Sequence, residues 1–130
     1  MDIKELAQKF IEAHKEAWEK GTFEKLEKLE DPGIVQHSVP RGQDTVVGWE
    51  AHKKHIEQAR QTLLSLDWQY LTGEGNHFAL SYRLRATVNS TTPGAHPPDA
   101  KEVRYDYLYV FHVSGGKIDR IWYAGTTTYT

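Results

Sequence analysis

The stretch Glu102–Thr126, EVRYDYLYVFHVSGGKIDRIWYAGT, decides the fold. It contains two strand-like runs, Glu102–Val113 and Lys117–Thr126, joined by Ser114-Gly115-Gly116, and a turn of this composition predicts a β-hairpin. In the first run every second residue is apolar or aromatic: Val103, Tyr105, Tyr107, Tyr109, Phe111 and Val113. Because side chains alternate across a strand, one face of the hairpin is predicted to be a wall of tyrosine against which something packs or binds.

Length and composition indicate an ordinary globular protein. A chain of 130 residues fits one domain, 1–130, that is large enough to bury a core. The net charge of −2 and a charged fraction of 26% give no reason to expect nucleic acid as a partner. No apolar run is long enough to span a membrane, and the charged first residues are unlike a signal peptide, so we expect no membrane partner and a cytoplasmic location. Cysteine is absent, which excludes disulfides and thiol catalysis.

Three helices are expected before the long strands. Apolar residues recur at helical spacing over Ile3–Lys20, and a second, shorter helix is expected over 22–30. A third helix is expected from about Gly48 to Ser65. The inward stripes of the first and third helices carry three histidines: His14, His52 and His55.

The remaining segments predict further strands and two loops. The strands are expected at Ile34–Val39, Asp67–Thr72 and His77–Val88, and the loops at Pro40–Val47 and Asn89–Pro98. Helices followed by long antiparallel strands indicate an α+β domain with the helices on one face of the sheet. A strongly curved, mainly antiparallel sheet closing over three helices would form a cone with an internal pocket.

The order of these elements resembles a known family, and several short motifs support the likeness. The sequences IVQHSVP (34–40), GWEAHKKHI (48–56), Pro97-Pro98 and GGKIDRIWYAGT (115–126) are similar to the SnoaL-like polyketide cyclase, or ester cyclase, family of the nuclear-transport-factor-like fold. The resemblance covers nearly the whole chain. It implies a deep, mostly apolar pocket in which an acidic residue, with a His, Asn or Tyr partner, moves a proton to drive an aldol-type ring closure.

Two positions of the sequence depart from the family pattern, and a third position matches it. The family's acid usually stands four residues after the tryptophan of the last strand, and after Trp122 this position is Thr126. A threonine hydroxyl cannot act as a general base near neutral pH without help. Asn89 stands where the family often has a histidine, whereas the histidine at the end of the first strand is present as His37.

Three residues are the candidates for catalysis: His37, His55 and Tyr109. A histidine side chain titrates near pH 6.5, at about neutral pH, so it can act as a general base or as a hydrogen-bond donor. Tyr109, midway along its strand, can donate to a developing enolate while His37 or His55 moves the proton. The alternative is structural, with the histidines bonded to neighbouring backbone and the tyrosines packed in the core. The candidates for substrate binding are His14, His52, Tyr82, Asn89, Tyr105, Tyr107, Trp122 and Thr126.

Three hypotheses of function follow. The first is a cofactor-free acid–base enzyme, of cyclase, isomerase or lyase type, acting on a small hydrophobic, ring-containing or polyketide-like molecule. The second is a non-catalytic small-molecule binding protein with the same pocket, and the third is a structural dimerising domain. His52 and His55 could share a metal with His14 or His37, but no carboxylate stands at ligand spacing, so no metal is expected. Apolar Leu108 and Val110 on the outer face of the sheet predict a homodimer through that face.

Overall fold

The computed structural model describes residues 2–89, 92 and 96–130, and half of the expected loop Asn89–Pro98, residues 90–91 and 93–95, lies outside them. The helices are α1 (Ile3–Lys20), α2 (Glu24–Leu29) and α3 (Trp49–Ala59), which runs into a short 3-10 turn, η1 (Arg60–Thr62). The strands are β1 (Glu30–Ser38), β2 (Gln43–Val47), β3 (Leu63–Glu74), β4 (His77–Thr87), β5 (Glu102–Ser114) and β6 (Lys117–Tyr129).

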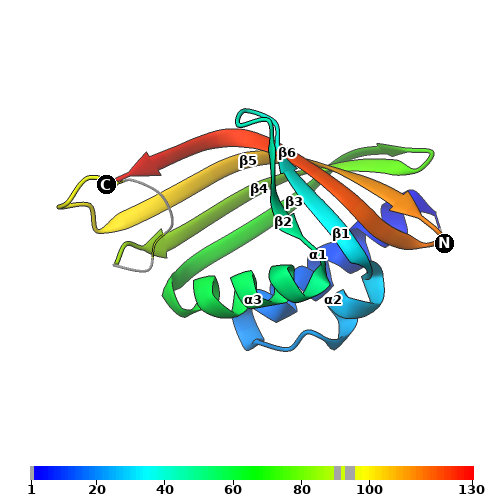
Figure 1. The fold of residues 1–130 in the computed structure, drawn as a ribbon, viewed down its shortest axis with the longest axis horizontal. Coiled ribbons are helices and arrows are strands. Elements are labelled where there is room, and N and C mark those ends of the chain that lie inside the picture. Colours follow the sequence, from blue (N-terminus) through cyan, green and yellow to red (C-terminus); the bar gives the residue numbers. More distant parts are fainter. Residues whose placement is uncertain (1, 90–91, 93–95) are drawn as a thin grey trace.

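The strands form one six-stranded sheet in the order β2-β1-β6-β5-β4-β3. Strand β1 runs parallel to β6, and all other neighbours are antiparallel. Figure 1 shows the three helices gathered on one side of this sheet. The predicted α+β class, with its helices and mainly antiparallel sheet, is therefore confirmed, while the closed cone stays a prediction. None of the described helices is long and apolar enough to cross a membrane.

Helix α1 is fixed at both ends by its own sequence. The Asp2 side chain accepts a hydrogen bond from the backbone N–H of Glu5 at 2.8 Å, which satisfies a donor that the first turn leaves open. Gly21 ends the helix in the left-handed conformation, φ 71°, and donates to the carbonyl of Ala17. The Arg60 guanidinium then donates to the carbonyl of Trp18 at 3.0 Å and ties the end of α1 to the end of α3.

Three phenylalanines form the centre of the core. The rings of Phe78 and Phe111 stack at 4.4 Å across β4 and β5, and Phe10 of α1 lies 4.7 Å from Phe111. All three side chains are at most 1% exposed, and burying each ring stabilises the fold by about 1.5–3 kcal/mol. Phe10 and Phe111 also line the cavity described below, so this cluster closes one part of it.

The sequence prediction was wrong about several element boundaries. The expected loop Pro40–Val47 contains β2, an edge strand whose residues are mostly exposed and therefore show no alternation of apolar and polar residues. Strand β1 begins at Glu30 rather than at Ile34, with an irregular stretch between Glu30 and Val35 where it pairs with β6. Helix α3 ends earlier than Ser65, and β6 extends beyond Thr126 to Tyr129.

Candidate functional site

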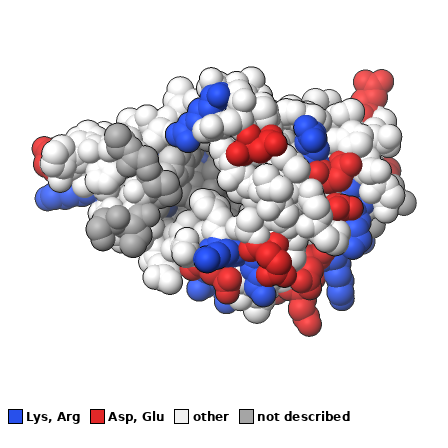
Figure 2. Space-filling view, viewed as in Figure 1, with Lys and Arg blue, Asp and Glu red and all other residues white. Residues whose placement is uncertain are grey.

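A cavity of about 870 Å³ lies between α1, α3 and the inner face of the sheet. Figure 2 shows the molecule hollowed between α3 and the turn that joins β1 to β2, and residues of both segments line this cavity. The lining is largely aromatic and uncharged. Seven of the residues predicted for the site lie in it: His14, His52, His55, Tyr82, Tyr105, Tyr107 and Tyr109. Trp68, which was not predicted, lines it as well.

A buried histidine–carboxylate pair stands behind the helix side of the cavity. Nδ1 of His52, in the first part of α3, lies 2.7 Å from Oε1 of Glu30, the first residue of β1. The two side chains are 4% and 0% exposed. Because an ionised carboxylate only accepts hydrogen bonds, Nδ1 carries the proton that it donates to Glu30. His52 lines the cavity, so its second nitrogen, Nε2, is the one available to a bound molecule.

The second oxygen of Glu30 has no hydrogen-bond partner within the described part of the chain. An unpaired buried oxygen costs stability, on the order of 1–3 kcal/mol, so natural proteins contain few of them. The sequence reading missed Glu30, because it was assigned to the end of a helix, 22 positions before His52. No periodicity connects two residues at that separation, and only the fold brings them together.

His14 lies between two tryptophans. The indole N–H of Trp68 points at Nδ1 of His14 at 2.9 Å, and that of Trp18 points at Nε2 at 3.2 Å. A neutral imidazole has only one accepting nitrogen, so it can accept from one indole at a time. Complete burial, followed by the nearby charges of His52 and His55, lowers the pKa of His14 well below its usual range. His14 therefore stays neutral, and one indole N–H is left to donate elsewhere in the cavity.

His55 lies at the more open part of the cavity, with its ring 6.3 Å from that of Trp18. Desolvation lowers the pKa of His55, and the neighbouring His52 lowers it further. The imidazole of His55 is therefore a neutral group near neutral pH. Only His52, among the three histidines of the cavity, has a carboxylate to stabilise an added proton.

Two phenols face these histidines from the sheet. The rings of Tyr82 and Tyr109 lie 5.3 Å apart and pack on Trp68 at 4.4 and 5.1 Å. Desolvation, followed by the neighbouring tyrosines, raises the pKa of both hydroxyls, so they remain protonated donors. Neither hydroxyl has a protein acceptor within the described residues, although both residues line the cavity. They are placed to donate to an oxygen atom of a bound molecule.

Tyr105 and Tyr107 continue this wall toward the end of the sheet. The Tyr107 hydroxyl lies 3.0 Å from the hydroxyl of Thr127, and Gly125 stands opposite Tyr107 on β6. A Cβ added at Gly125 would lie 2.6 Å from Cδ1 of the Tyr107 ring and would also clash with the carbonyl oxygen of Asp106. Glycine is required here because the Tyr107 ring crosses directly over the neighbouring backbone.

The structure places His37, Trp122, Thr126 and Asn89 outside this cavity. Along β1 the inward residues are Gln36 and Ser38, so His37 points to the opposite face, where its Nδ1 lies 2.9 Å from Oδ1 of Asp44. His37 pairs with Trp122 of β6 on that outer side. Because Trp122 itself points outward, the position four residues later also points outward, and Thr126 stands opposite Asp106. Thr127, the next residue, lines the cavity.

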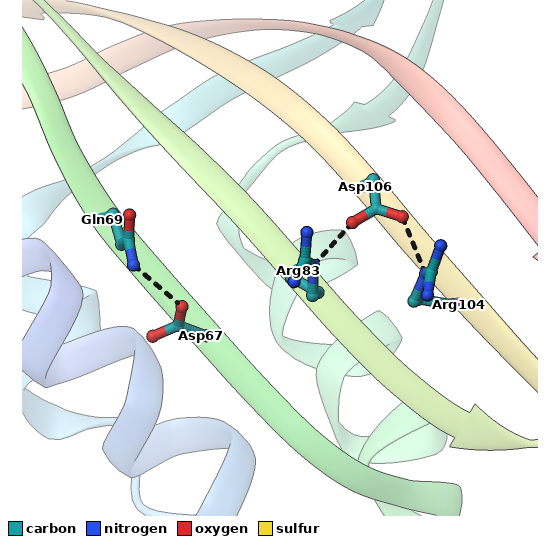
Figure 3. Close-up of polar contacts among 5 residues, drawn as sticks. All are labelled: Asp67, Gln69, Arg83, Arg104 and Asp106. Atoms are coloured by element: carbon teal, nitrogen blue, oxygen red, sulfur yellow. Dashed lines mark hydrogen bonds and ion pairs between the residues drawn. The ribbon is translucent and has the colours of Figure 1, made fainter.

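The outer face of the sheet carries ion pairs, and Asp67, Arg83 and Asp106 of this face line a second, open depression. Figure 3 shows that Asp106 of β5 accepts from two arginines, Arg83 Nε at 2.7 Å and Arg104 Nε at 2.9 Å. The hydrogen bond from Arg83, and then that from Arg104, hold the pKa of Asp106 below its usual range. Within the described residues, no group of three or more His, Asp or Glu side chains is arranged to hold a metal ion.

An α+β domain with a largely aromatic cavity between its helices and its sheet is typical of the nuclear-transport-factor-2-like fold. A model of the SnoaL-like domain matches residues 11–121, and the chain belongs to this family. The family resemblance inferred from the sequence is thus confirmed. No curated protein sequence matches the chain.

Three solved structures illustrate the likeness in fold. A proposed SnoaL-like polyketide cyclase from Mesorhizobium loti is 21% identical, with 95% of this chain and 99% of that chain covered and a TM-score of 0.68. An epoxide hydrolase/cyclase-like enzyme of pyran ring formation in the polyether salinomycin is 16% identical, with coverage of 99% and 98% and a TM-score of 0.72. An NTF2-like protein from Anabaena variabilis is 15% identical, with coverage of 95% and 88% and a TM-score of 0.64.

Proposed function

We propose that this protein is an acid–base enzyme that acts, without a cofactor, on a small hydrophobic molecule containing a ring and a carbonyl group. The observation that supports this function is the buried Glu30–His52 pair, which faces the phenols of Tyr82 and Tyr109 across a cavity. A base oriented by a buried acid and opposed by fixed donors is the arrangement that proton abstraction next to a carbonyl requires. Because proteins of similar fold include cyclase-like enzymes, we propose a ring closure, an isomerisation or an elimination as the reaction.

The proposed reaction begins at Nε2 of His52. Nε2 takes a proton from the carbon next to the carbonyl, and the C–H electron pair moves onto the carbonyl oxygen to give an enolate. Glu30 stabilises the imidazolium that forms, because its carboxylate is desolvated and lies 2.7 Å from Nδ1. A positioned base of this kind contributes about 10²- to 10⁴-fold to the rate.

The phenols complete the step. Tyr109 and Tyr82 donate to the enolate oxygen, and their raised pKa values keep the donated protons on the tyrosines. For ring closure, the enolate carbon attacks a second carbonyl carbon of the same molecule, and the resulting alkoxide takes the proton from His52. For isomerisation, a carbon of the enolate takes that proton instead, and in both courses His52 returns to its starting state. In this proposal the acid that the family usually carries on the last strand is replaced by Glu30 of β1, acting through His52. His37 takes no part, because it lies on the other face of the sheet.

The alternative of a non-catalytic binding protein uses the same cavity. No Asp or Glu side chain of the described residues lines it, so no carboxylate can react directly with a bound molecule. A protein that binds a ring in this aromatic lining without moving a proton would fit that observation. The two functions differ in one measurable property, which is the exchange of a carbon-bound proton. A homodimer through the outer face is compatible with both and stays a prediction.

Deuterium exchange of 2-tetralone tests the proposal. This ring ketone has acidic hydrogens next to its carbonyl, and their replacement in D₂O is followed by proton NMR. We expect the protein to accelerate exchange, His52→Gln to lower the catalysed rate by about 10²-fold or more, and Tyr109→Phe to lower it by about tenfold.

The control is His112→Gln, which changes a histidine on the outer face that is paired with Asp119 at 2.6 Å. This variant should exchange 2-tetralone like the unsubstituted protein. Binding of 2-tetralone without accelerated exchange would support the binding protein instead. If His52→Gln lowered the melting temperature together with the exchange rate, the residue would have a structural role.

A further inference from the structure

The mouth of the cavity carries one cation that has no partner. Arg41, in the turn between β1 and β2, is the only Arg or Lys among the described residues that line the cavity. It is exposed, and no carboxylate of the described residues lies within ion-pair distance of it. Other side chains at this part of the lining, such as Gln58, Gln61 and Thr62, are uncharged. The positive charge of Arg41 is therefore not balanced where a ligand would enter.

The turn that carries Arg41 is well defined. Gly42 adopts φ 62°, a left-handed conformation that favours glycine, and its N–H donates to the carbonyl of Ser38 at 2.9 Å. Ser38 lines the cavity, so the turn begins at the cavity wall. Asp44, the nearest acid along the chain, is occupied on the outer face by His37 at 2.9 Å. Asp44 therefore does not neutralise Arg41.

The interior of the cavity offers several hydrogen-bond donors that have no acceptor within the described residues. The hydroxyls of Tyr82 and Tyr109 lack acceptors, and His14 can satisfy only one of its two indoles. These donors tolerate a polar substituent or the π-face of a ring in the interior. The aromatic side chains of the lining also supply stacking surfaces for a flat ring.

We propose that the ligand of this cavity is an aromatic carboxylate, with its ring between the helices and the tyrosine wall and its carboxylate held at the mouth by Arg41. A guanidinium binds a planar carboxylate through two parallel hydrogen bonds, which makes arginine suited to this group. The proposal rests on the proposed use of the cavity as a ligand site, but it does not depend on catalysis. It identifies Arg41 as a residue that determines specificity.

Binding of a matched pair of ligands tests this proposal. The pair is 2-naphthoate and methyl 2-naphthoate, which share the ring and differ in charge, and their dissociation constants are measured by calorimetry at low and high salt. We expect naphthoate to bind more tightly than its ester at low salt. Arg41→Gln should weaken naphthoate binding by about three- to tenfold and leave the ester unchanged, since an exposed ion pair contributes modestly and is screened by salt.

Lys54→Gln is the matched control, because it removes one exposed cation of α3 that does not line the cavity. It should change neither affinity. Three results would overturn the proposal. Arg41→Gln could weaken the binding of both ligands equally, or Lys54→Gln could selectively weaken the binding of naphthoate. The unsubstituted protein could also bind the ester as tightly as the acid. A failure of binding by both ligands would also overturn it. A protein that binds naphthoate through Arg41 but exchanges no proton of 2-tetralone would contradict only the proposed enzyme function.

Discussion

Strand β1 contributes to two histidine–carboxylate pairs that lie on opposite faces of the sheet. On the cavity side Glu30 Oε1 lies 2.7 Å from Nδ1 of His52, and on the outer side His37 Nδ1 lies 2.9 Å from Oδ1 of Asp44. The distances are nearly equal, but the first pair is 4% and 0% exposed and the second is 28% and 48% exposed. Two contacts of the same chemistry therefore stand in very different surroundings.

This difference decides what each pair can do. Water and salt screen the outer pair, so it contributes little to stability and leaves the histidine available to solvent. The buried pair lies in a medium of low dielectric, where an uncompensated charge is costly, so the Glu30 carboxylate depends on the hydrogen bond from His52. The buried pair also adjoins a cavity, which is the condition for its proton to reach a bound molecule. Contact distance alone does not identify a catalytic histidine; burial and access do.

The largest expected difference between the two pairs is in the stability lost when the histidine of each is removed. His52→Leu leaves Glu30 buried without any partner, and we expect it to lower the free energy of unfolding by about 3 kcal/mol or more. His37→Leu leaves Asp44 in water, and we expect a loss of about 1 kcal/mol or less. Urea unfolding of the two variants measures both values, and equal losses would show that burial does not distinguish the pairs.

Burial of a histidine should also make the stability of the protein depend on pH, and His14 tests this. The pKa of His14 is lowered in the folded state by burial, whereas in the unfolded chain a histidine titrates at about 6.5. The contribution of His14 to the free energy of unfolding is therefore complete above about pH 6.5. Below that pH it declines by up to about 1.4 kcal/mol per pH unit, because only the unfolded chain binds the proton.

His14→Gln removes this titration while keeping an acceptor for one indole. The decline in stability between about pH 7.5 and about pH 5.5 should be smaller in this variant than in the unsubstituted protein. Urea midpoints at several pH values measure both slopes. Identical slopes would mean that His14 is not held neutral by the fold.

The sequence was sufficient for the parts of the fold that have a strong period. The alternation of β5 predicted which tyrosines share a face, and Tyr105, Tyr107 and Tyr109 do line the cavity. The amphipathic stripe of α1 likewise predicted that His14 is inward, and it is buried among aromatic rings. In both elements, one face is buried against the rest of the molecule, and such burial imposes a periodic pattern.

The parts that the sequence did not predict depend on contacts between distant residues. Strand β2 is a short, exposed edge strand, and its residues carry no alternating pattern. The inward position at the end of β6 is Thr127 rather than Thr126, because the tryptophan used as the reference, Trp122, points outward. Glu30 is inserted beneath α3 by the path of β1, and no local pattern marks a carboxylate that is buried in this way.

The most direct test of the account compares Glu30→Gln with Asp44→Asn in the deuterium exchange of 2-tetralone. Both variants replace a carboxylate that accepts from Nδ1 of a histidine, and both keep the shape of the side chain. The account predicts that Glu30→Gln lowers the catalysed exchange rate by about tenfold or more, because His52 loses the charge that stabilises its added proton, while Asp44→Asn leaves the rate unchanged. Unchanged exchange in Glu30→Gln, or equal losses in both variants, would contradict it.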